Sequence, residues 1–564
     1  MASVIGTLLI ILGALVWLVW LARLGLMGAR MYQIEEYEGP RLLAWGRQRA
    51  WLAPSALMTA ALVALGVGAL GALGVMTALV TSGVSLQDAT LWGAGAIGVA
   101  WLIGSAIGAL YWRSLPAKKP LVYTQRMRRI LGVAAALAII LAALLVVAMR
   151  LIPPAFSVIF PFLILAFSPL FVLYILIAAN WLLKPVEARI QAGFVSRARA
   201  KYTRLAPLTI GVAGSYGKTS AKRILAALLQ PALETLPTPK SYNTLMGVTR
   251  TINENLELRH KAFVVEMDAY GPGEIAAMCR LVDPTITLVT SVGPQHLERF
   301  GTIERIADAM FELISALPKG APAVIYGGEA QTAALADRAA AAGYRTVRYG
   351  LEGDDAGPLD VIASDIQVDD RATRFTWRWP AENLEQRVAI SLLGQHNILN
   401  VSAALAVIHL LDLPVNEAAR DALKLEPAEH RLQLIRNPGG LTIIDDSYNA
   451  NPVGVHNGLD ALKQVPGRRK ILVTPGMVEL GPVEEEENRK YGEYAATICD
   501  YVILVGARQT KPIAAGLRAN GFSEDHLRVV ETLDEVNAAL TSVAGPGDVA
   551  LFANDLPDTY VALK

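Results

Sequence analysis

The sequence is poor in cysteine and almost without net charge, and both facts narrow the classes of protein it can belong to. Its 564 residues include two cysteines, Cys279 and Cys499, which form no CxxC pair, so neither a disulfide framework nor a zinc site is indicated. The net charge is +1, so overall charge gives no reason to expect a nucleic-acid partner. Charged residues make up 18% and hydrophobic residues 53%, with a mean hydropathy of +0.39, so disorder is excluded and a membrane part is expected.

Long stretches without charge are confined to the first third of the chain. Each is long enough for the roughly 20 residues that a spanning helix needs, and they cover residues 4–21, 52–80, 91–112, 130–149 and 156–183. We therefore predict a domain of about five transmembrane helices over residues 1–206. Pro161 and Pro169 leave open whether the last stretch is one kinked helix or a re-entrant pair.

Arginine and lysine occur mainly in alternate loops between these stretches. The first loop, 22–51, and the third, 113–129, are rich in both, whereas the second, 81–90, has only Asp88 as a charged residue. By the positive-inside rule the basic loops are cytoplasmic, which places the N-terminus outside and everything after Lys184 inside. We expect a multi-pass protein of the cell membrane whose soluble half is cytoplasmic.

From residue 207 onward short β-branched runs alternate with helical patterns, as in parallel α/β domains. The predicted strands are 208–213, 262–267, 285–291, 441–445, 470–474, 501–506 and 548–552, and 373–379 and 387–393 look like an additional β excursion. A long helical segment ends near residues 427–431. The predicted division is therefore 1–206, 207–428 and 429–564.

A glycine-rich loop directly follows the first of these strands and opens a helix. Glycines let backbone N–H groups close around phosphate oxygens, Lys218 can reach the terminal phosphates, and Thr219 can bind magnesium. The loop consists of Gly214, Ser215, Tyr216, Gly217, Lys218, Thr219 and Ser220. Val212 stands where the strict Walker motif has its first glycine. We predict a nucleotide-phosphate site, and a glycine-rich turn without a ligand is the alternative.

Further candidate residues follow two other predicted strands. The run 263–268 ends in the carboxylates Glu266 and Asp268, and His296 follows the strand 285–291. Because the carboxyl ends of parallel strands share one edge of a sheet, we expect these groups near the glycine loop. Beside a phosphate loop, a magnesium site is favoured over purely structural roles.

Five sequence blocks resemble the Mur ligase family, and most closely its MurF branch, which adds D-alanyl-D-alanine to the cell-wall precursor. They are the loop 214–220, Gly-Pro-Gln-His-Leu-Glu-Arg-Phe-Gly at 293–301, Gly-Gln-His-Asn-Ile-Leu-Asn at 394–400, Asp-Asp-Ser-Tyr-Asn-Ala-Asn-Pro at 445–452 and Met-Val-Glu-Leu-Gly at 477–481. The resemblance covers about 207–564. It implies a central ATPase domain over 207–428 and a C-terminal Rossmann-like domain over 429–564.

The resemblance also implies ATP and Mg²⁺ as cofactors and assigns the site residues. Lys218 would bind phosphate, Thr219 would hold one magnesium ion, and Glu266 and His296 the other. Asn397 and Asn400 would face adenine, Arg431 would approach the phosphates, and Asp446 would hold the ribose hydroxyls. The implied catalytic residues are Lys218, His296 and Arg431.

The sequence departs from the family pattern in three places. Met310 stands where the family has a lysine that becomes carbamylated and binds metal. The C-terminal blocks differ at 475–477 and 553–555, where Pro-Gly-Met and Ala-Asn-Asp replace Gly-Asp-Met and Lys-Gly-Ser. The predicted transmembrane helices also occupy the place of the uridine-nucleotide-binding domain.

These features predict a membrane-embedded, ATP-dependent amide ligase of cell-envelope synthesis that works through an acyl phosphate. Its partners would be a muropeptide or related precursor, soluble or lipid-linked, and an amino acid or dipeptide. Two alternatives stay open. One is an ATP-driven transporter or flippase motor, and the other is a pseudo-ligase scaffold that binds nucleotide without turnover.

Overall fold

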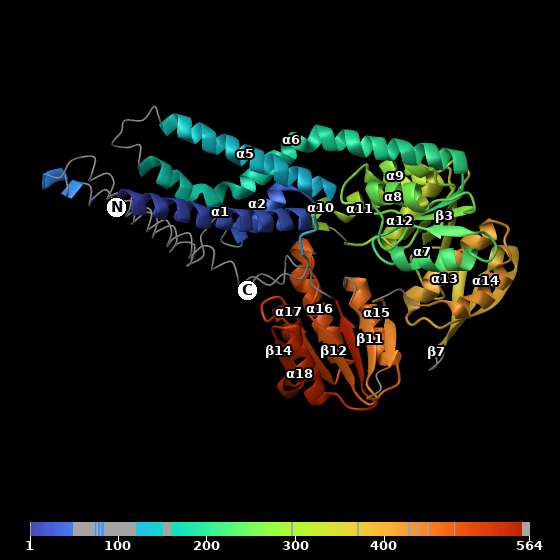
Figure 1. Cartoon of the computed structure of the whole chain (residues 1–564). Helices are drawn as coiled ribbons and strands as arrows, with labels where there is room; N and C mark the ends of the chain where they lie inside the picture. The colour runs from blue at the N-terminus through green and yellow to red at the C-terminus, as the bar shows by residue number, and fades with distance from the viewer. Residues whose placement is uncertain are drawn as a thin grey trace. The chain divides into compact units, whose positions relative to one another are not determined.

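The computed structural model divides between Ile190 and Gln191 into two compact units, each described by itself (Figure 1). Within the chain it describes residues 2–48, a few positions from 71 to 83, and residues 120–149, 159–294, 297–368, 372–426, 430–436, 439–447, 451–478 and 480–554.

The first unit is helical. Its described helices are α1 (Ala2–Ile34), α2 (Gly39–Gln48), α5 (Gln125–Met149) and the first part of α6 (Ile159–Leu205). Thr124 begins α5, because its hydroxyl accepts the N–H of Met127 at 3.1 Å and so satisfies one of the free donors of the first turn. The helix α6 runs through Pro161 and Pro169 without interruption, so this segment is one helix rather than a re-entrant pair.

Two helices among the described residues are long and apolar enough to cross a membrane. They are Gln125–Leu144 within α5 and Phe171–Leu205 within α6. The predicted stretch 4–21 lies inside α1, whereas nearly all of 52–80 and the whole of 91–112 lie outside the described residues. The count of about five spanning helices therefore stays a prediction.

The second unit begins with a nine-stranded sheet in the order β2-β3-β1-β4-β5-β6-β7-β8-β9. The pairs from β2 to β7 are parallel, and the last two pairs are antiparallel. The strands are β1 (Leu208–Ala213), β2 (Thr235–Pro237), β3 (Ala262–Glu266), β4 (Ile286–Val289), β5 (Pro322–Tyr326), β6 (Arg345–Leu351), β7 (Val361–Val368), β8 (Thr373–Trp379) and β9 (Leu384–Ile390). The β excursion expected from the sequence is thus an antiparallel extension of the main sheet.

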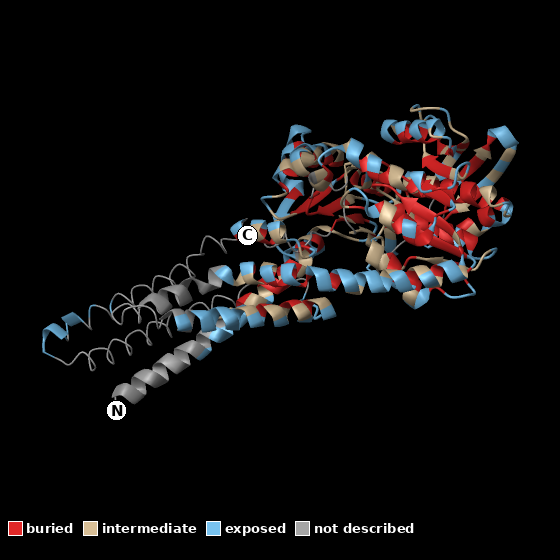
Figure 2. Ribbon diagram, turned by 90° about the horizontal axis from the view of Figure 1, so that it is seen from above, coloured by how far each residue is buried: buried red, intermediate tan, exposed pale blue. Residues whose placement is uncertain are grey.

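Helices cover both faces of this sheet. They are α7 (Lys218–Leu229), α8 (Leu245–Asn255), α9 (Glu274–Val282), α10 (Leu297–Phe300), α11 (Ile303–Ser315), α12 (Ala330–Ala341), α13 (Gln395–Leu410) and α14 (Val415–Asp421). Alternate residues of β3 face opposite cores, since Val264 packs with α7 and α13 while Phe263 and Val265 pack with α9 and α11. Figure 2 shows the strands almost wholly buried between these layers.

A second, six-stranded sheet follows in the order β10-β11-β15-β12-β13-β14, parallel except for the pair β10–β11. Its strands are β10 (Gln433–Arg436), β11 (Thr442–Asp446), β12 (Lys470–Thr474), β13 (Tyr501–Val505), β14 (Leu527–Val530) and β15 (Val549–Ala553). Its helices are α15 (Pro452–Gln464), α16 (Glu484–Ala496), α17 (Lys511–Ala519) and α18 (Leu533–Val543). This arrangement is the α/β architecture that the sequence predicts.

The buried carboxylate of Asp548 supports a stability prediction for this second sheet. Its side chain is 0% exposed and is hydrogen-bonded to Arg468 at 3.0 Å and to Arg469 at 2.8 Å. Burial opposes the charge, but the hydrogen bonds from Arg469 and Arg468 lower the pKa of Asp548 well below its usual value. We expect Asp548→Ala to reduce the opening free energy of the β12 and β15 amides, measured by hydrogen exchange, by about 2–3 kcal/mol.

The same carboxylate predicts the pH dependence. A depressed carboxyl pKa stabilises the folded state above the unfolded pKa of about 3.9, and this stabilisation is lost as pH falls through the folded value. The gap between wild type and Asp548→Ala should therefore narrow in acid. The exposed Asp525 is the control, and an equal loss in Asp525→Ala would contradict the assignment.

Candidate active site

The glycine loop lies at the carboxyl end of β1, in the middle of the large sheet. β1 pairs with β3 on one side and β4 on the other. After β1 the chain forms β2 and β3 on one side of it and then crosses to β4 on the other side. The crevice at such a point is where open α/β sheets bind ligands. Gly214 adopts φ 141°, and a Cβ there would collide with the hydroxyl of Thr290, so the close backbone approach requires glycine.

Residues that follow β4 hold the loop in shape. The Ser215 hydroxyl donates to the carbonyl of Gly293 at 3.0 Å and accepts the N–H of the same residue at 2.8 Å. The Tyr216 N–H donates to the Ser291 hydroxyl at 2.8 Å, and its carbonyl accepts from Thr290. The loop is therefore pre-organised by contacts within the protein.

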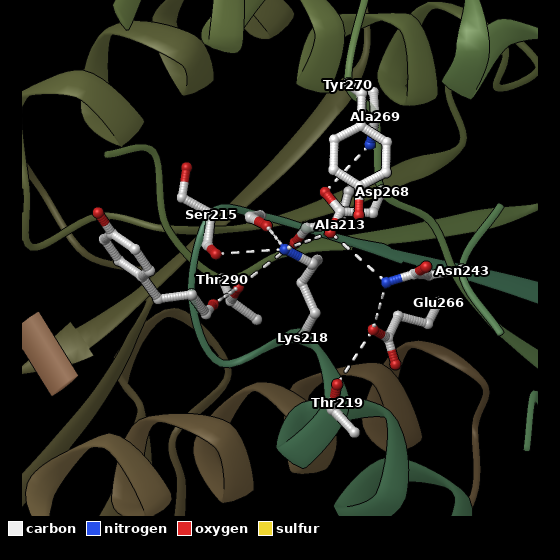
Figure 3. A network of polar contacts seen from close by, with 12 residues as sticks. Ala213, Ser215, Lys218, Thr219, Asn243, Glu266, Asp268, Ala269, Tyr270 and Thr290 are labelled. Carbon is white, nitrogen blue, oxygen red and sulfur yellow. Dashed lines mark hydrogen bonds and ion pairs between the residues drawn. The ribbon is translucent and has the colours of Figure 1, made fainter. Parts of the chain in front are cut away.

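Lys218 begins α7 and points back across the loop (Figure 3). Its Nζ donates to the carbonyls of Gly214 at 2.6 Å and Ser215 at 3.2 Å, and it is ion-paired with Asp268 at 3.2 Å. The side chain is only 6% exposed. A buried ammonium group at the N-terminus of a helix is suited to binding a polyphosphate.

Glu266 ends β3 and is surrounded by polar partners. Its Oε1 accepts from the Thr219 hydroxyl at 3.0 Å and from Asn243 at 3.2 Å, and its Oε2 is 2.9 Å from Lys222 Nζ. Burial lowers the pKa of Lys222, and the charge of Glu266 opposes that effect. The contributions of Lys222 and Asn243 were not predicted from the sequence.

The donor set fits a magnesium ion. The Thr219 hydroxyl and the Glu266 carboxylate have oxygen atoms 3.0 Å apart. Both are hard oxygen ligands, which Mg²⁺ prefers. No group of three or more His, Cys, Asp or Glu side chains suited to a metal exists among the described residues, and His296 lies outside them. Met310 is 2% exposed on α11 and packs in the apolar core, so its thioether supplies no ligand.

Two candidate asparagines lie in the first turns of α13, and Asn400 is the one that the contacts place beside the loop. The amide nitrogen of Asn397 donates to the Leu393 carbonyl at 2.7 Å. Asn400 is 3% exposed, and its Nδ2 is buried without a hydrogen bond to any described residue. Its Oδ1 lies 3.6 Å from the point where Gly217 would carry a Cβ. An unsatisfied buried amide beside the loop is a group that a ligand would satisfy.

Arg431 and Asp446 lie close to each other at the start of the C-terminal domain. Burial raises the pKa of Asp446 to about 6, and the charge of Arg431 opposes this shift. Asp446 Oδ1 also accepts the N–H of Leu432 at 3.2 Å. Arg431 influences His396 as well, whose pKa is lowered to about 4 by burial and by that cation. The structure therefore links the junction residue Arg431 to both domains of the second unit.

Comparison with known proteins agrees with this geometry. Residues 212–408 match the Mur ligase middle domain, and residues 430–554 match the Mur ligase glutamate ligase domain. The UDP-N-acetylmuramoyl-tripeptide–D-alanyl-D-alanine ligase of Mycobacterium leprae is 32% identical over 366 residues, which cover 61% of this chain and 70% of that protein. The chain belongs to the Mur ligase family.

Two further relatives define how far the similarity extends. The ligase of the same name from Mycobacterium tuberculosis is 33% identical over 305 residues, covering 53% of this chain and 58% of that protein. The solved structure of the MurF ligase from Thermotoga maritima in complex with ADP has a TM-score of 0.58 and 26% identity, covering 66% of this chain and 82% of that one. The chain thus spans less than two thirds of the length of the tuberculosis relative.

Proposed function

We propose that the chain is a membrane-embedded ligase that uses ATP and Mg²⁺ to join a carboxylate of a cell-envelope precursor to the amine of an amino acid or dipeptide. The observation that carries this proposal is the glycine loop with Lys218, Thr219 and Glu266 at the carboxyl edge of the sheet. Mur ligases use ATP and Mg²⁺, and the Thermotoga relative binds ADP. Residues 1–206 act as a membrane domain, 207–428 as the ATP-binding domain and 429–564 as the closing domain.

The reaction proceeds in two steps. An oxygen of the acceptor carboxylate attacks the γ-phosphorus of ATP, the bond to the β-phosphate oxygen breaks, and ADP leaves with that electron pair. The amine then attacks the acyl carbonyl, phosphate leaves, and the amine loses a proton to give the amide. Because carboxylate and triphosphate repel each other, positive charge must be concentrated where they meet.

Each residue of the site has a separate role in binding the nucleotide and the metal. Lys218 and the loop N–H groups bind the β- and γ-phosphates, Arg431 adds a second cation from the domain junction, and Asp446 holds the ribose. Asn397 and Asn400 contact adenine. One magnesium ion would be held by Thr219 and another by Glu266 and His296, and these ions would neutralise charge on the phosphate oxygens. Met310 adds no anionic ligand, so we expect weaker magnesium affinity than a site with a further carboxylate would have.

A two-substrate assay separates this function from its alternatives. A ligase releases ADP only when both the carboxylate acceptor and the amine are present. A transporter motor would hydrolyse ATP without the amine. A pseudo-ligase scaffold, the alternative that Met310 leaves open, would bind nucleotide and release no ADP. ADP release that ignores the amine would refute the proposal.

Exposed apolar side chains support the membrane assignment of the first unit. Ile139, Ile140 and Leu141 are consecutive on α5 and are all more than half exposed, so this helix presents apolar groups in several directions. In water each would forgo roughly 1.5–3 kcal/mol of burial free energy. A helix that is apolar all around is suited to a lipid environment.

The topology can be tested with single cysteines placed in two loops. We expect a cysteine at Asp88 to react with an impermeant thiol reagent from outside intact cells, and one at Lys118 to react only after the membrane is opened. Both positions lie outside the described residues. Equal labelling of the two from outside would refute the assigned orientation.

An arginine at the start of α5 supports a lipid-linked acceptor. The Arg126 guanidinium donates to Asn180 at 3.2 Å and lies 3.9 Å from the centre of the Tyr37 ring, and its Nε is buried without an acceptor among the described residues. A cation in the first helical turn is disfavoured by the helix dipole. A phosphate group of a lipid headgroup would compensate both effects.

We therefore expect the purified protein to ligate a lipid-linked muropeptide faster than its soluble uridine-nucleotide counterpart at equal concentration. Arg126→Gln should raise the KM for the lipid-linked muropeptide and so reduce the preference for it by about tenfold, because one charge-assisted contact is lost. Arg128, which is exposed in the same turn, is the matched control. Preference for the soluble substrate, unchanged when the spanning helices are deleted, would contradict this assignment.

A further inference from the structure

Asp268 is a buried carboxylate that contacts the phosphate-binding lysine directly. It follows β3 by two residues, and its side chain is 9% exposed. Oδ1 accepts the N–H of Ala269 at 3.0 Å, while Oδ2 lies 3.2 Å from Lys218 Nζ and 3.5 Å from Asn243 Nδ2 (Figure 3). Asp268 is therefore held in place by the backbone with one oxygen directed at the lysine.

This contact determines where the lysine charge is directed. An ammonium group has three donors, and Lys218 directs its Nζ at the Gly214 carbonyl, the Ser215 carbonyl and Asp268. To bind a phosphate oxygen, the ammonium group must give up at least one of these partners. Asp268 is the charged partner, so the phosphate competes with it most directly.

Asp268 also lies next to the proposed metal ligands. The Nδ2 of Asn243 is 3.2 Å from Glu266 Oε1 and 3.5 Å from Asp268 Oδ2, so the two carboxylates converge on one amide group. The same Glu266 oxygen accepts from Thr219 at 3.0 Å. If Lys218 turned to a phosphate, Asp268 would remain as a buried anion without its cation, which is strongly unfavourable unless another cation replaces it.

We propose that Asp268 is a positioning residue that exchanges Lys218 for the magnesium ion when nucleotide binds. Without nucleotide it holds the lysine inside the loop. With the metal-bound nucleotide in place, the lysine binds phosphate, and Asp268 stabilises the ion held by its neighbour Glu266, either directly or through a bound water. This inference rests on the nucleotide site proposed above, and it makes loading of the site depend on metal and nucleotide together.

The test uses two binding measurements with opposite expected signs. The first is the affinity of the full-length protein in detergent for ADP in excess EDTA. In Asp268→Asn it should be about three- to tenfold tighter, because Lys218 no longer has a competing carboxylate. The second is the affinity of the ADP complex for Mn²⁺, followed by electron paramagnetic resonance. It should be about tenfold weaker, as for other residues that orient a metal site.

Asp283→Asn is the matched control. Asp283 is ion-paired with Arg199 at 2.6 Å and is 62% exposed. Its replacement by Asn therefore removes an aspartate ion pair in the same unit without touching the glycine loop. Neither affinity should change in this variant. Asp268→Glu, which retains the charge, should keep metal-free ADP binding close to wild type and provides the comparison if Asp268→Asn does not fold.

Four results would be decisive. A loss of both affinities in Asp268→Asn, or no change in either, would overturn the exchange and leave Asp268 a structural residue. Tighter metal-free ADP binding in Asp268→Glu would also overturn it. Failure of the wild-type protein to bind ADP under any condition would instead refute the proposed nucleotide site, so the two failures are distinguishable.

Discussion

Lys218→Ala should reduce ATP turnover by about a thousandfold or more while the protein stays folded and inserted in the membrane. The lysine lies on a pre-organised loop and is the cation nearest to the bound phosphates in the proposed complex, and removing such a group raises the barrier of phosphoryl transfer. Turnover is measured as ADP release with both substrates present.

The control for this variant is Lys424→Ala. Lys424 is 79% exposed and is paired only with Asp421 at 2.6 Å among the contacts described, so it shares the residue type without the site. Its turnover should match wild type. Near-normal turnover in Lys218→Ala would rule out the ligase assignment, because no other described lysine contacts the loop carbonyls in this way.

Glu266→Gln should lower turnover by at least about a hundredfold and also destabilise the protein. The carboxylate is 1% exposed and is both a proposed magnesium ligand and the partner of the buried Lys222 at 2.9 Å. Its removal takes away transition-state charge stabilisation. It also leaves a buried ammonium group without its counter-charge, for which a loss of about 3 kcal/mol in unfolding free energy is typical.

A double variant separates these two effects. In Glu266→Gln with Lys222→Met, a buried ion pair is replaced by groups of similar volume, so the thermal unfolding temperature should recover much of its loss. Turnover should stay low, because the metal ligand is still missing. Recovery of turnover together with stability would show that Glu266 serves only to pair with Lys222.

Much of the fold follows from local sequence. The loop 214–220 was predicted because glycines between an apolar run and a helical pattern specify a strand, a turn and a helix over neighbouring residues. The strand 208–213 and the C-terminal strand 470–474 were predicted with the bounds that the structure has. The acidic run 484–487 forms the first turn of α16, where the helix dipole favours carboxylates.

Other strands were not predicted. β5 contains Val324, Ile325 and Tyr326, which favour a strand, but its run is short and starts with Pro322. It is a strand because β4 and β6 pair with it on either side. The continuity of α6 also could not be predicted, because two prolines left a break open, whereas the structure has one helix from Ile159 to Leu205.

Some residues of the site could also be predicted from the sequence, whereas others were found only in the structure. The sequence by itself determined Lys218, Thr219 and Glu266 as candidates, because a loop motif and the end of a strand are local features, and family resemblance added Asn397, Asn400, Arg431 and Asp446. Only the tertiary structure brought Lys222 to Glu266, 44 residues away, and Asp268 to Lys218. Such pairings depend on which strands are neighbours in the sheet, and strand order is decided by the packing of the whole domain rather than by any local pattern.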